Sequence, residues 1–298
     1  MGGSAEPTID ARRSSIGRRL ASTRRPRESS STAAGLERTP WLSRLHRALR
    51  EERFVLHYQP IVSMHDGRVA HYEALVRLVD ADGAGLLAPA AFLPAAERYG
   101  IISAIDRAVL DKALAAVAEL PAPAARTRIR RRAHPHARGT AVAVNLSALS
   151  LTDPGMLSYL QGRLAHHAVA GEALVLEVTE TASISDMALA REFCAGAAAL
   201  GCELALDDFG SGFGSFHYLR HLDFAYLKID GGFIRGLCGS ATDRRVVFSL
   251  VALARGMGAR TVAEYVQDAR TLTLLRELGV DYAQGFAVGR PGPLPALA

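Results

Sequence analysis

Lysine is almost absent from this sequence, and cysteine is scarce. Only Lys112 and Lys228 are lysines among 35 basic residues, so 35 − 2 = 33 are arginines. The 3 cysteines form no CxxC pattern, which excludes a redox-active pair of that kind and suits a reducing compartment. No apolar run approaches the ~20 residues of a membrane span, and the N-terminus lacks the apolar segment of a signal peptide. We therefore expect a cytoplasmic protein without a membrane partner.

The positive charge is concentrated in two segments of the chain. Residues 1–40 hold eight arginines against four acids, 8 − 4 = +4, and residues 126–138 hold six arginines and no acid. With a total of +5, the remainder carries 5 − 4 − 6 = −5 and is mildly acidic. Neither segment shows the interleaved aromatics that stack on bases, or a helix-turn-helix or zinc spacing. We therefore favour a solvated tail and a surface loop, with nucleic-acid binding as the weaker alternative.

The sequence divides into a tail and a folded region. Residues 1–40 are rich in serine, arginine and small residues without a sustained apolar period, which predicts a disordered tail. Residues 41–298 are expected to form one domain, beginning with a helix at Trp41. Short apolar runs then alternate with amphipathic helices, and they predict eight strands at 54–62, 69–78, 141–147, 173–180, 203–208, 224–230, 259–266 and 281–288.

The pattern of these strands predicts a fold class. Near-continuous apolar strands that alternate with helices are typical of a parallel sheet, and eight such units indicate a barrel. The segment "SMHDGR" (63–68) is typical of a hairpin turn between the first two strands. The predicted fold is therefore α/β, an irregular TIM-type (β/α)8 barrel with one antiparallel strand. We expect His57 and His71, in the first two strands, to belong to barrel packing or to the rim.

Polar residues interrupt seven of the predicted strands. From Asn145 onward they recur at gaps of 32, 30, 21, 36 and 20 residues, each about one βα unit. One buried acid alone is often structural, but seven strand ends at one barrel mouth predict a catalytic site. Five carboxylates cannot all ionise there without divalent cations, and an oxygen-only set favours Mg²⁺ or Mn²⁺ over zinc. The residues are Glu73, Asn145, Glu177, Asp207 with Asp208, Lys228, Glu264 and Gln284.

A set of motifs around these residues resembles a known family. In order and spacing, the motifs resemble the EAL family of cyclic di-GMP phosphodiesterases, from about Trp41 to Pro291. They are "EALVR" (73–77), "NLS" (145–147), "EVTE" (177–180), "DDFGSGFGS" (207–215), "YLKID" (226–230), "AEYV" (263–266) and "QGFAVGRP" (284–291).

The resemblance implies metal ligands and a catalytic group. Asp207 would bridge two metal ions, and Lys228 would contact the attacking water, so that Lys228, Glu264 and Asp208 form the catalytic set. The implied ligands of the first ion are Glu73, Asn145, Glu177 and Asp207, and those of the second are Asp207, Asp208 and Glu264.

The resemblance also implies substrate contacts and an anchor for the glycine-rich loop, residues 209–215. Glu180 would hold that loop. The implied substrate-binding residues are Gln59, Leu75, Arg77, Asp230 and Gln284.

The reaction implied by the resemblance is hydrolysis of one phosphodiester bond of cyclic di-GMP to linear pGpG, which ends a bacterial second-messenger signal. It would use two Mg²⁺ or Mn²⁺ ions in a two-metal mechanism, with Ca²⁺ inhibitory and a homodimer expected. One motif departs from the family's A-E-G-V-E: Tyr265 replaces the glycine and Gln267 the second glutamate. The alternative is a catalytically weak EAL domain that acts as a cyclic di-GMP receptor and signals to a protein partner. Action on another phosphoester is more remote.

Overall fold

The computed structural model describes residues 41–81, 83, 85–120, 141–180, 184–210 and 218–294. The expected tail at 1–40, the arginine-rich segment 126–138 and residues 211–215 of the glycine-rich loop lie outside the described residues. All described residues belong to one unit, Pro40–Ala298.

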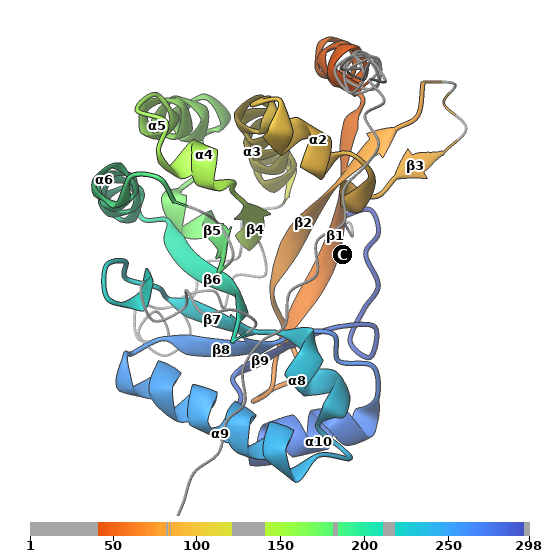
Figure 1. Cartoon of the computed structure of the whole chain (residues 1–298), viewed down its shortest axis with the longest axis vertical. Helices are drawn as coiled ribbons and strands as arrows, with labels where there is room; N and C mark the ends of the chain where they lie inside the picture. Colours follow the sequence, from red (N-terminus) through yellow and green to blue (C-terminus); the bar gives the residue numbers. More distant parts are fainter. Residues whose placement is uncertain are drawn as a thin grey trace, which may run out of the picture. The chain divides into compact units, whose positions relative to one another are not determined.

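Eight strands close into a barrel, as the sequence predicted (Figure 1). The order is β1-β9-β8-β7-β6-β5-β4-β2, and the pairing of β1 with β2 completes the ring. β1 runs antiparallel to both neighbours, whereas the other barrel pairings are parallel. The strands are β1 (Phe54–Ser63), β2 (Val69–Val79), β4 (Ala141–Asn145), β5 (Leu174–Thr179), β6 (Glu203–Phe209), β7 (Tyr226–Ile229), β8 (Arg260–Ala263) and β9 (Tyr282–Gln284).

One further strand was not predicted. β3 (Leu86–Leu87) pairs antiparallel with the end of β2, outside the barrel. Two residues are too few to show a period in the sequence.

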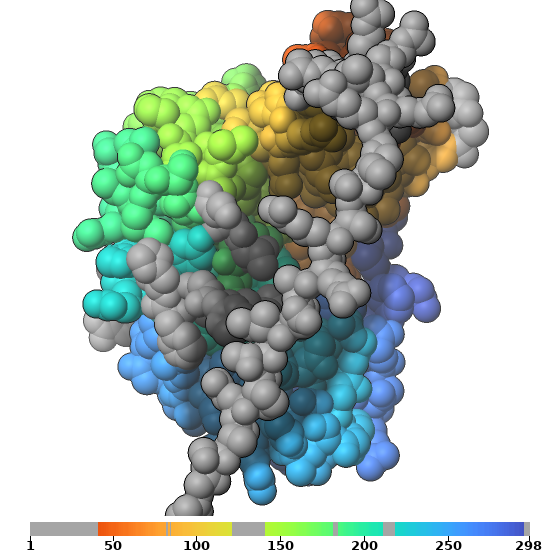
Figure 2. Space-filling view, viewed as in Figure 1, coloured from red at the N-terminus to blue at the C-terminus, as the bar shows by residue number. Residues whose placement is uncertain are grey.

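Helices form the outer layer around the barrel (Figure 1), and the green α4–α6 and blue α9 and α10 make up much of the surface in Figure 2. Residues 41–50 are helical, as expected, and short 3₁₀ turns lie at Pro89–Ala91 and Gly171–Ala173. The other helices are α2 (Leu93–Arg98), α3 (Ile102–Glu119), α4 (Ala148–Leu151), α5 (Met156–His167), α6 (Met187–Ala199), α8 (Gly231–Gly236), α9 (Ala241–Gly256) and α10 (Ala269–Glu277).

Side-chain caps set the start of several helices. A side-chain oxygen at the N-cap accepts a backbone N–H that the first turn leaves unpaired. The capping residues are Asp186 for α6, Asp230 for α8, Ser240 for α9 and Asp268 for α10. None of the described helices has the length and apolarity that crossing a bilayer requires.

The interior of the barrel holds two clusters, each with residues from every barrel strand or from the position directly after it. The packed cluster is built of apolar and aromatic side chains and His71, whose ring centroid lies 5.3 Å from that of Tyr226. Its apolar and aromatic members are Ile61, Ala70, Ala143, Val175, Ala205, Tyr226, Val262 and Tyr282, and the His71 ring lies against the rings of Tyr226 and Tyr282. The burial of His71, at 1% exposed, confirms its expected place in barrel packing.

The polar cluster lies two residues further along each parallel strand. Side chains two residues apart face the same side of a strand, so the cluster also faces the interior, toward the carboxyl ends of the parallel strands. On antiparallel β1 the polar residue, Gln59, comes two positions before the packed residue, Ile61. The members are Gln59, Glu73, Asn145, Glu177, Asp207, Lys228, Glu264 and Gln284.

Candidate functional site

Lys228 lies at the centre of the polar cluster. Its Nζ is 2.8 Å from Glu177 Oε2, 2.9 Å from Asp207 Oδ1, 2.9 Å from Glu264 Oε1 and 3.5 Å from Glu73 Oε2. The Lys228 side chain is 1% exposed, and so is that of Glu177. Carboxylates from four strands therefore surround the buried ammonium of Lys228 on β7.

Amide side chains extend the cluster on the side of Glu73. Asn145 Nδ2 donates to Glu73 Oε1 at 2.7 Å, and Gln284 Nε2 donates to Glu73 Oε2 at 2.6 Å. Gln284 Nε2 also lies 3.2 Å from Gln59 Oε1, and Gln59 pairs directly with Glu73 in the β1–β2 register. These contacts fix both oxygens of Glu73 and orient its carboxylate.

Asp208 reaches the cluster through a break in strand regularity. It has φ 54°, and the β6–β7 register shifts between Leu206 and Phe209. A bulge of this kind turns a side chain that strict alternation would direct to the other face. Asp207, Asp208 and Glu264 consequently offer carboxylate oxygens within 4.8 Å of one another.

Burial and crowding of like charges change the proton affinity of these groups. Burial raises the pKa of Glu177 and of Glu264 well above the usual range, and neighbouring carboxylates add to the effect. Burial also raises the pKa of Asp208, with Asp207 contributing. Burial alone would lower the pKa of Lys228, but the surrounding carboxylates raise it well above its usual value. The one ammonium therefore does not offset the effect of burial on Glu177, Glu264 and Asp208.

The donor set fits a hard divalent cation. Glu177 Oε1 and Gln284 Oε1 are buried and accept no hydrogen bond from any described residue. A buried oxygen without a partner costs free energy, and a cation ligated by that oxygen removes the cost. Carboxylate and amide oxygens are also the ligands that Mg²⁺ and Mn²⁺ prefer. The polar cluster is thus a possible metal site.

The remaining predicted residues lie around the cluster. Glu180 Oε2 accepts a hydrogen bond from Gly210 N at 2.8 Å, immediately before the part of the glycine-rich loop that is not described. Asp230 caps α8 by accepting from Gly232 N at 2.8 Å. Leu75 and Arg77 follow Glu73 by two and four residues on the same face of β2, and both are half-buried.

Comparison of the sequence with models of known protein families identifies the family of this chain. The sequence model of the EAL domain matches residues 42–291. This chain belongs to the EAL family.

Two curated relatives from bacteria share this EAL region. One is the cyclic di-GMP phosphodiesterase PdeB of Shewanella oneidensis, 35% identical over 255 residues, which cover 85% of this chain and 28% of PdeB. The other is the bifunctional diguanylate cyclase/cyclic di-GMP phosphodiesterase MucR of Pseudomonas aeruginosa, 35% identical over 91% of this chain and 38% of MucR. The chain therefore spans well under half the length of either relative.

Solved EAL structures share the fold. The MucR phosphodiesterase in complex with c-di-GMP superposes with a TM-score of 0.72 at 35% identity, over 85% of this chain and 97% of that one. The FimX EAL domain of Xanthomonas citri in complex with c-di-GMP gives a TM-score of 0.75 at 31% identity, over 89% of this chain and 98% of that one.

Tyr265, the residue that departs from the EAL motif, lies next to the cluster. It follows Glu264 directly and has φ 53°, a left-handed conformation that costs a tyrosine about 1–3 kcal/mol. Burial first, and then the charges of Glu264 and Asp208, raise the pKa of its hydroxyl. Gln267, the other departure, is exposed and its Nε2 donates to Tyr265 O at 3.3 Å.

One glycine in the EAL motifs has a packing role that the sequence analysis did not assign. Gly285 has φ 152°, and a Cβ there would lie 2.2 Å from Val266 O. Only glycine therefore allows the chain after β9 to pass so close to the chain after β8. The "QG" dipeptide at the end of a predicted strand is the signal that could have indicated it.

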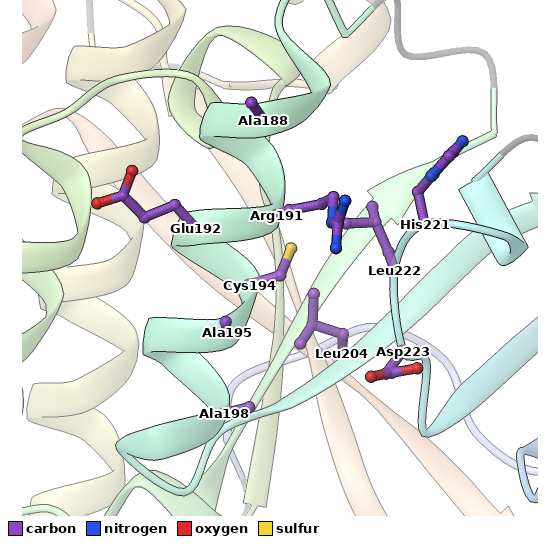
Figure 3. A pocket seen from close by; sticks show the side chains of 10 residues that line it. All are labelled: Ala188, Arg191, Glu192, Cys194, Ala195, Ala198, Leu204, His221, Leu222 and Asp223. Carbon is purple, nitrogen blue, oxygen red and sulfur yellow. The ribbon is translucent and has the colours of Figure 1, made fainter.

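A separate hollow lies outside the EAL barrel, between α6 and residues 221–223 (Figure 3). It measures about 400 Å³ and meets β6 at Leu204. In Figure 3 the side chain of Arg191 extends toward Leu222, whereas Glu192 points away from it. None of its lining residues is among the predicted site residues.

Proposed function

We propose that this chain is a metal-dependent cyclic di-GMP phosphodiesterase that hydrolyses one phosphodiester bond to give linear 5'-pGpG. The observation that carries the proposal is the polar cluster, in which eight barrel strands bring buried carboxylates, amides and one ammonium together. The names of PdeB and MucR support the substrate, because both describe phosphodiesterases of cyclic di-GMP.

The charge balance supports two divalent ions. Five carboxylates and one ammonium sum to 1 − 5 = −4, and two divalent cations would add 2 × 2 = +4. Bound Mg²⁺ or Mn²⁺ ions would supply positive charge to the attacking and leaving oxygens of the phosphodiester. The residues that would hold them are Glu73, Asn145, Glu177 and Asp207 for one ion, and Asp207, Asp208 and Glu264 for the other.

Lys228 positions the attacking water. Its ammonium lies among carboxylates of three strands. Bound divalent ions would share these carboxylates, and a compact N–H donor of Lys228 could then hold one water in line with phosphorus. Asp208 and Glu264 complete the catalytic set beside it. Glu180 holds the glycine-rich loop through Gly210.

Substrate contacts come from the β1, β2 and β9 side of the mouth and from the end of β7. Arg77 offers a guanidinium to phosphate or guanine, and Leu75 an apolar surface between Arg77 and Glu73. Gln59 and Gln284 present amides, and Asp230 a carboxylate.

Product analysis tests the proposal. The purified full chain is incubated with cyclic di-GMP and Mg²⁺ or Mn²⁺, and the products are separated by chromatography. We expect pGpG with either ion, no product with EDTA, and inhibition by Ca²⁺. The Asp207→Asn variant, purified in parallel, controls for a contaminating phosphodiesterase. Intact cyclic di-GMP after incubation of a folded, metal-loaded protein would contradict the proposal.

Tyr265 and Gln267 favour a second candidate, a receptor that binds cyclic di-GMP with little turnover. Tyr265 departs from the family motif directly after the proposed ligand Glu264, and Gln267 donates to Tyr265 O. Altered neighbours of a ligand can weaken metal binding. Tight binding of cyclic di-GMP without pGpG formation would identify the receptor. A homodimer is also proposed from the family resemblance, and light scattering during gel filtration measures the mass.

A further inference from the structure

Tyr265 is an exposed aromatic residue at the edge of a buried charged site. It lies one residue beyond Glu264. The residue is 54% exposed, and its backbone lies in the left-handed region. Large aromatic residues do not favour this conformation, whereas glycine adopts it freely. The surrounding structure must therefore hold the tyrosine in place.

Helix α8 provides that support. A Cβ on Gly231 would lie 2.3 Å from Tyr265 Cδ2, so the ring lies directly against the glycine backbone. One turn further along α8, the Arg235 guanidinium carbon lies 4.9 Å from the centre of the same ring. Residues four apart lie on the same side of a helix. The ring therefore rests along one side of α8, on a glycine and a guanidinium.

The position of the ring relates it to the substrate. Gly231 follows Asp230 just after β7, and Tyr265 follows Glu264 just after β8. β7 and β8 are neighbouring parallel strands, so the ring lies against the chain that leaves β7, beside the end of the strand that leads to Glu264. In cyclic di-GMP a ribose separates each base from the phosphodiester, so a substrate bound with its phosphodiester at the polar cluster would place its bases beyond the cluster, toward the rim. An aromatic ring with one supported side and an exposed remainder is the kind of surface on which nucleobases stack.

We propose that Tyr265, supported by Gly231 and Arg235, is a stacking shelf for a guanine base of the substrate. This inference rests on the proposed function, because it takes the substrate to be cyclic di-GMP. The tyrosine ring supplies the stacking surface, and the guanidinium beneath it fixes the ring by a cation–π contact. Arg235 also adds positive charge near a ligand that carries two phosphates.

Binding measured in Ca²⁺, where turnover is suppressed, tests the shelf on the full chain. Calorimetric titration with cyclic di-GMP should show Tyr265→Gly weakening affinity about 10-fold or more, as loss of one stacked base does. Glycine adopts this backbone conformation without strain, so the substitution does not force the main chain out of place. The melting temperature, measured in parallel, shows whether the variant remains folded. Tyr265→Phe keeps the ring and should bind within about twofold of wild type.

Two further variants sharpen the test. Arg235→Ala removes only the support and should weaken binding less than Tyr265→Gly, by about threefold. Phe248→Ala removes another exposed aromatic residue, 60% exposed on the outer helix α9, and should leave affinity unchanged. In turnover assays with Mg²⁺, most of the Tyr265→Gly effect should appear in KM, because stacking binds substrate and transition state alike.

The outcomes separate the shelf from the proposed function. Equal affinities of wild type and Tyr265→Gly would overturn the shelf alone. A wild type that binds cyclic di-GMP but forms no pGpG would overturn the phosphodiesterase alone, and the affinity comparison would still decide on the shelf. A wild type that binds no cyclic di-GMP would overturn both. Weakened binding by Tyr265→Phe equal to that of Tyr265→Gly would also contradict stacking, because the ring is retained.

Discussion

The packed cluster and the polar cluster share the same eight strands and the same barrel interior, separated by two residues along each strand. In one, Val175, Ala205 and Val262 fill space beside aromatic rings. In the other, the residues two positions further on, Glu177, Asp207 and Glu264, surround one lysine. A shift of about 6.6 Å along a strand thus exchanges apolar packing for charge.

The two clusters contribute to the fold in opposite ways. Burial of apolar side chains in the packed cluster stabilises the barrel by roughly 25 cal/mol per Å² and requires no outside partner. In the polar cluster, buried carboxylates lose hydration, and one lysine compensates only part of their charge. We infer that the barrel tolerates this cost because the packed cluster beneath holds the strands in register. Mutations in the polar cluster should then affect turnover, and mutations in the packed cluster should mainly affect stability.

The largest effect is expected for Asp207→Asn in the polar cluster. Asp207 is the proposed bridge between two ions and contacts Lys228 at 2.9 Å. Removing its charge should reduce kcat by at least ~10³-fold, of the order of removing a main electrostatic stabiliser. Steady-state hydrolysis of cyclic di-GMP measures the rate, and metal analysis of the purified variant measures occupancy. Turnover at a tenth of the wild-type rate with metal content unchanged would refute the bridging role.

Lys228→Arg keeps the charge and changes its shape. In a chain with 33 arginines and two lysines, a lysine inside a buried strand indicates that a compact ammonium is required. A planar guanidinium is larger and would displace the attacking water, so kcat should fall by about 10²-fold. Lys228→Ala should be at least as severe, while cyclic di-GMP affinity in Ca²⁺ changes far less. Near wild-type turnover by Lys228→Arg would move the water-positioning role elsewhere, with Gln284 the next candidate.

Most of the barrel and of the polar cluster could be predicted from the sequence. Each strand is an apolar run with one polar residue at a fixed place, and spacing of one βα unit brings these residues to the same end. The structure confirms all eight strands and joins Glu73, Asn145, Glu177, Lys228 and Gln284 by direct contacts. Local pattern was sufficient because the alternation of a strand fixes which side chains face inward.

The features that could not be predicted depend on contacts between distant segments. The left-handed backbone at Asp208 accompanies a shift in strand register, and sequence alternation carries no sign of such a bulge. Likewise, the motif showed that Tyr265 replaces a glycine, but not that Gly231 and Arg235 support its ring. Both are tertiary relations, which a single-sequence pattern does not encode.

Glu180 lies at the boundary of the polar cluster, and Glu180→Ala should have an intermediate effect on kcat. Its carboxylate accepts a hydrogen bond from Gly210 N, and Glu180 N donates to Asp207 O at 2.9 Å. Without the side chain, the loop loses a charge-assisted hydrogen bond, and we expect kcat to fall by roughly tenfold with a higher Mg²⁺ requirement. Glu180→Gln, which retains an accepting oxygen, should be milder. Unchanged kinetics and metal requirement for Glu180→Ala would exclude the anchor.

Val262→Ala tests the packed cluster on the strand that carries Glu264. Val262 is 1% exposed, and its truncation leaves a small cavity that should lower the free energy of unfolding by about 1–3 kcal/mol. Thermal unfolding should show a melting temperature lower by a few degrees, whereas kcat at a temperature well below melting should stay within about threefold. A selective loss of kcat, of the size seen for Asp207→Asn, would show that the two clusters are not separable.

The smallest effect is expected for deletion of residues 1–40, which belong to neither cluster. The EAL match begins at residue 42, and the helix at 41–50 places Leu45 in the core at 0% exposed, so truncation before Trp41 preserves that packing. The deletion also removes a net charge of 8 − 4 = +4. Kinetic constants should therefore stay within about twofold and the melting temperature should barely move, as measured on the truncated and full chains side by side. A large loss of kcat would assign the first 40 residues a role in the barrel or its site.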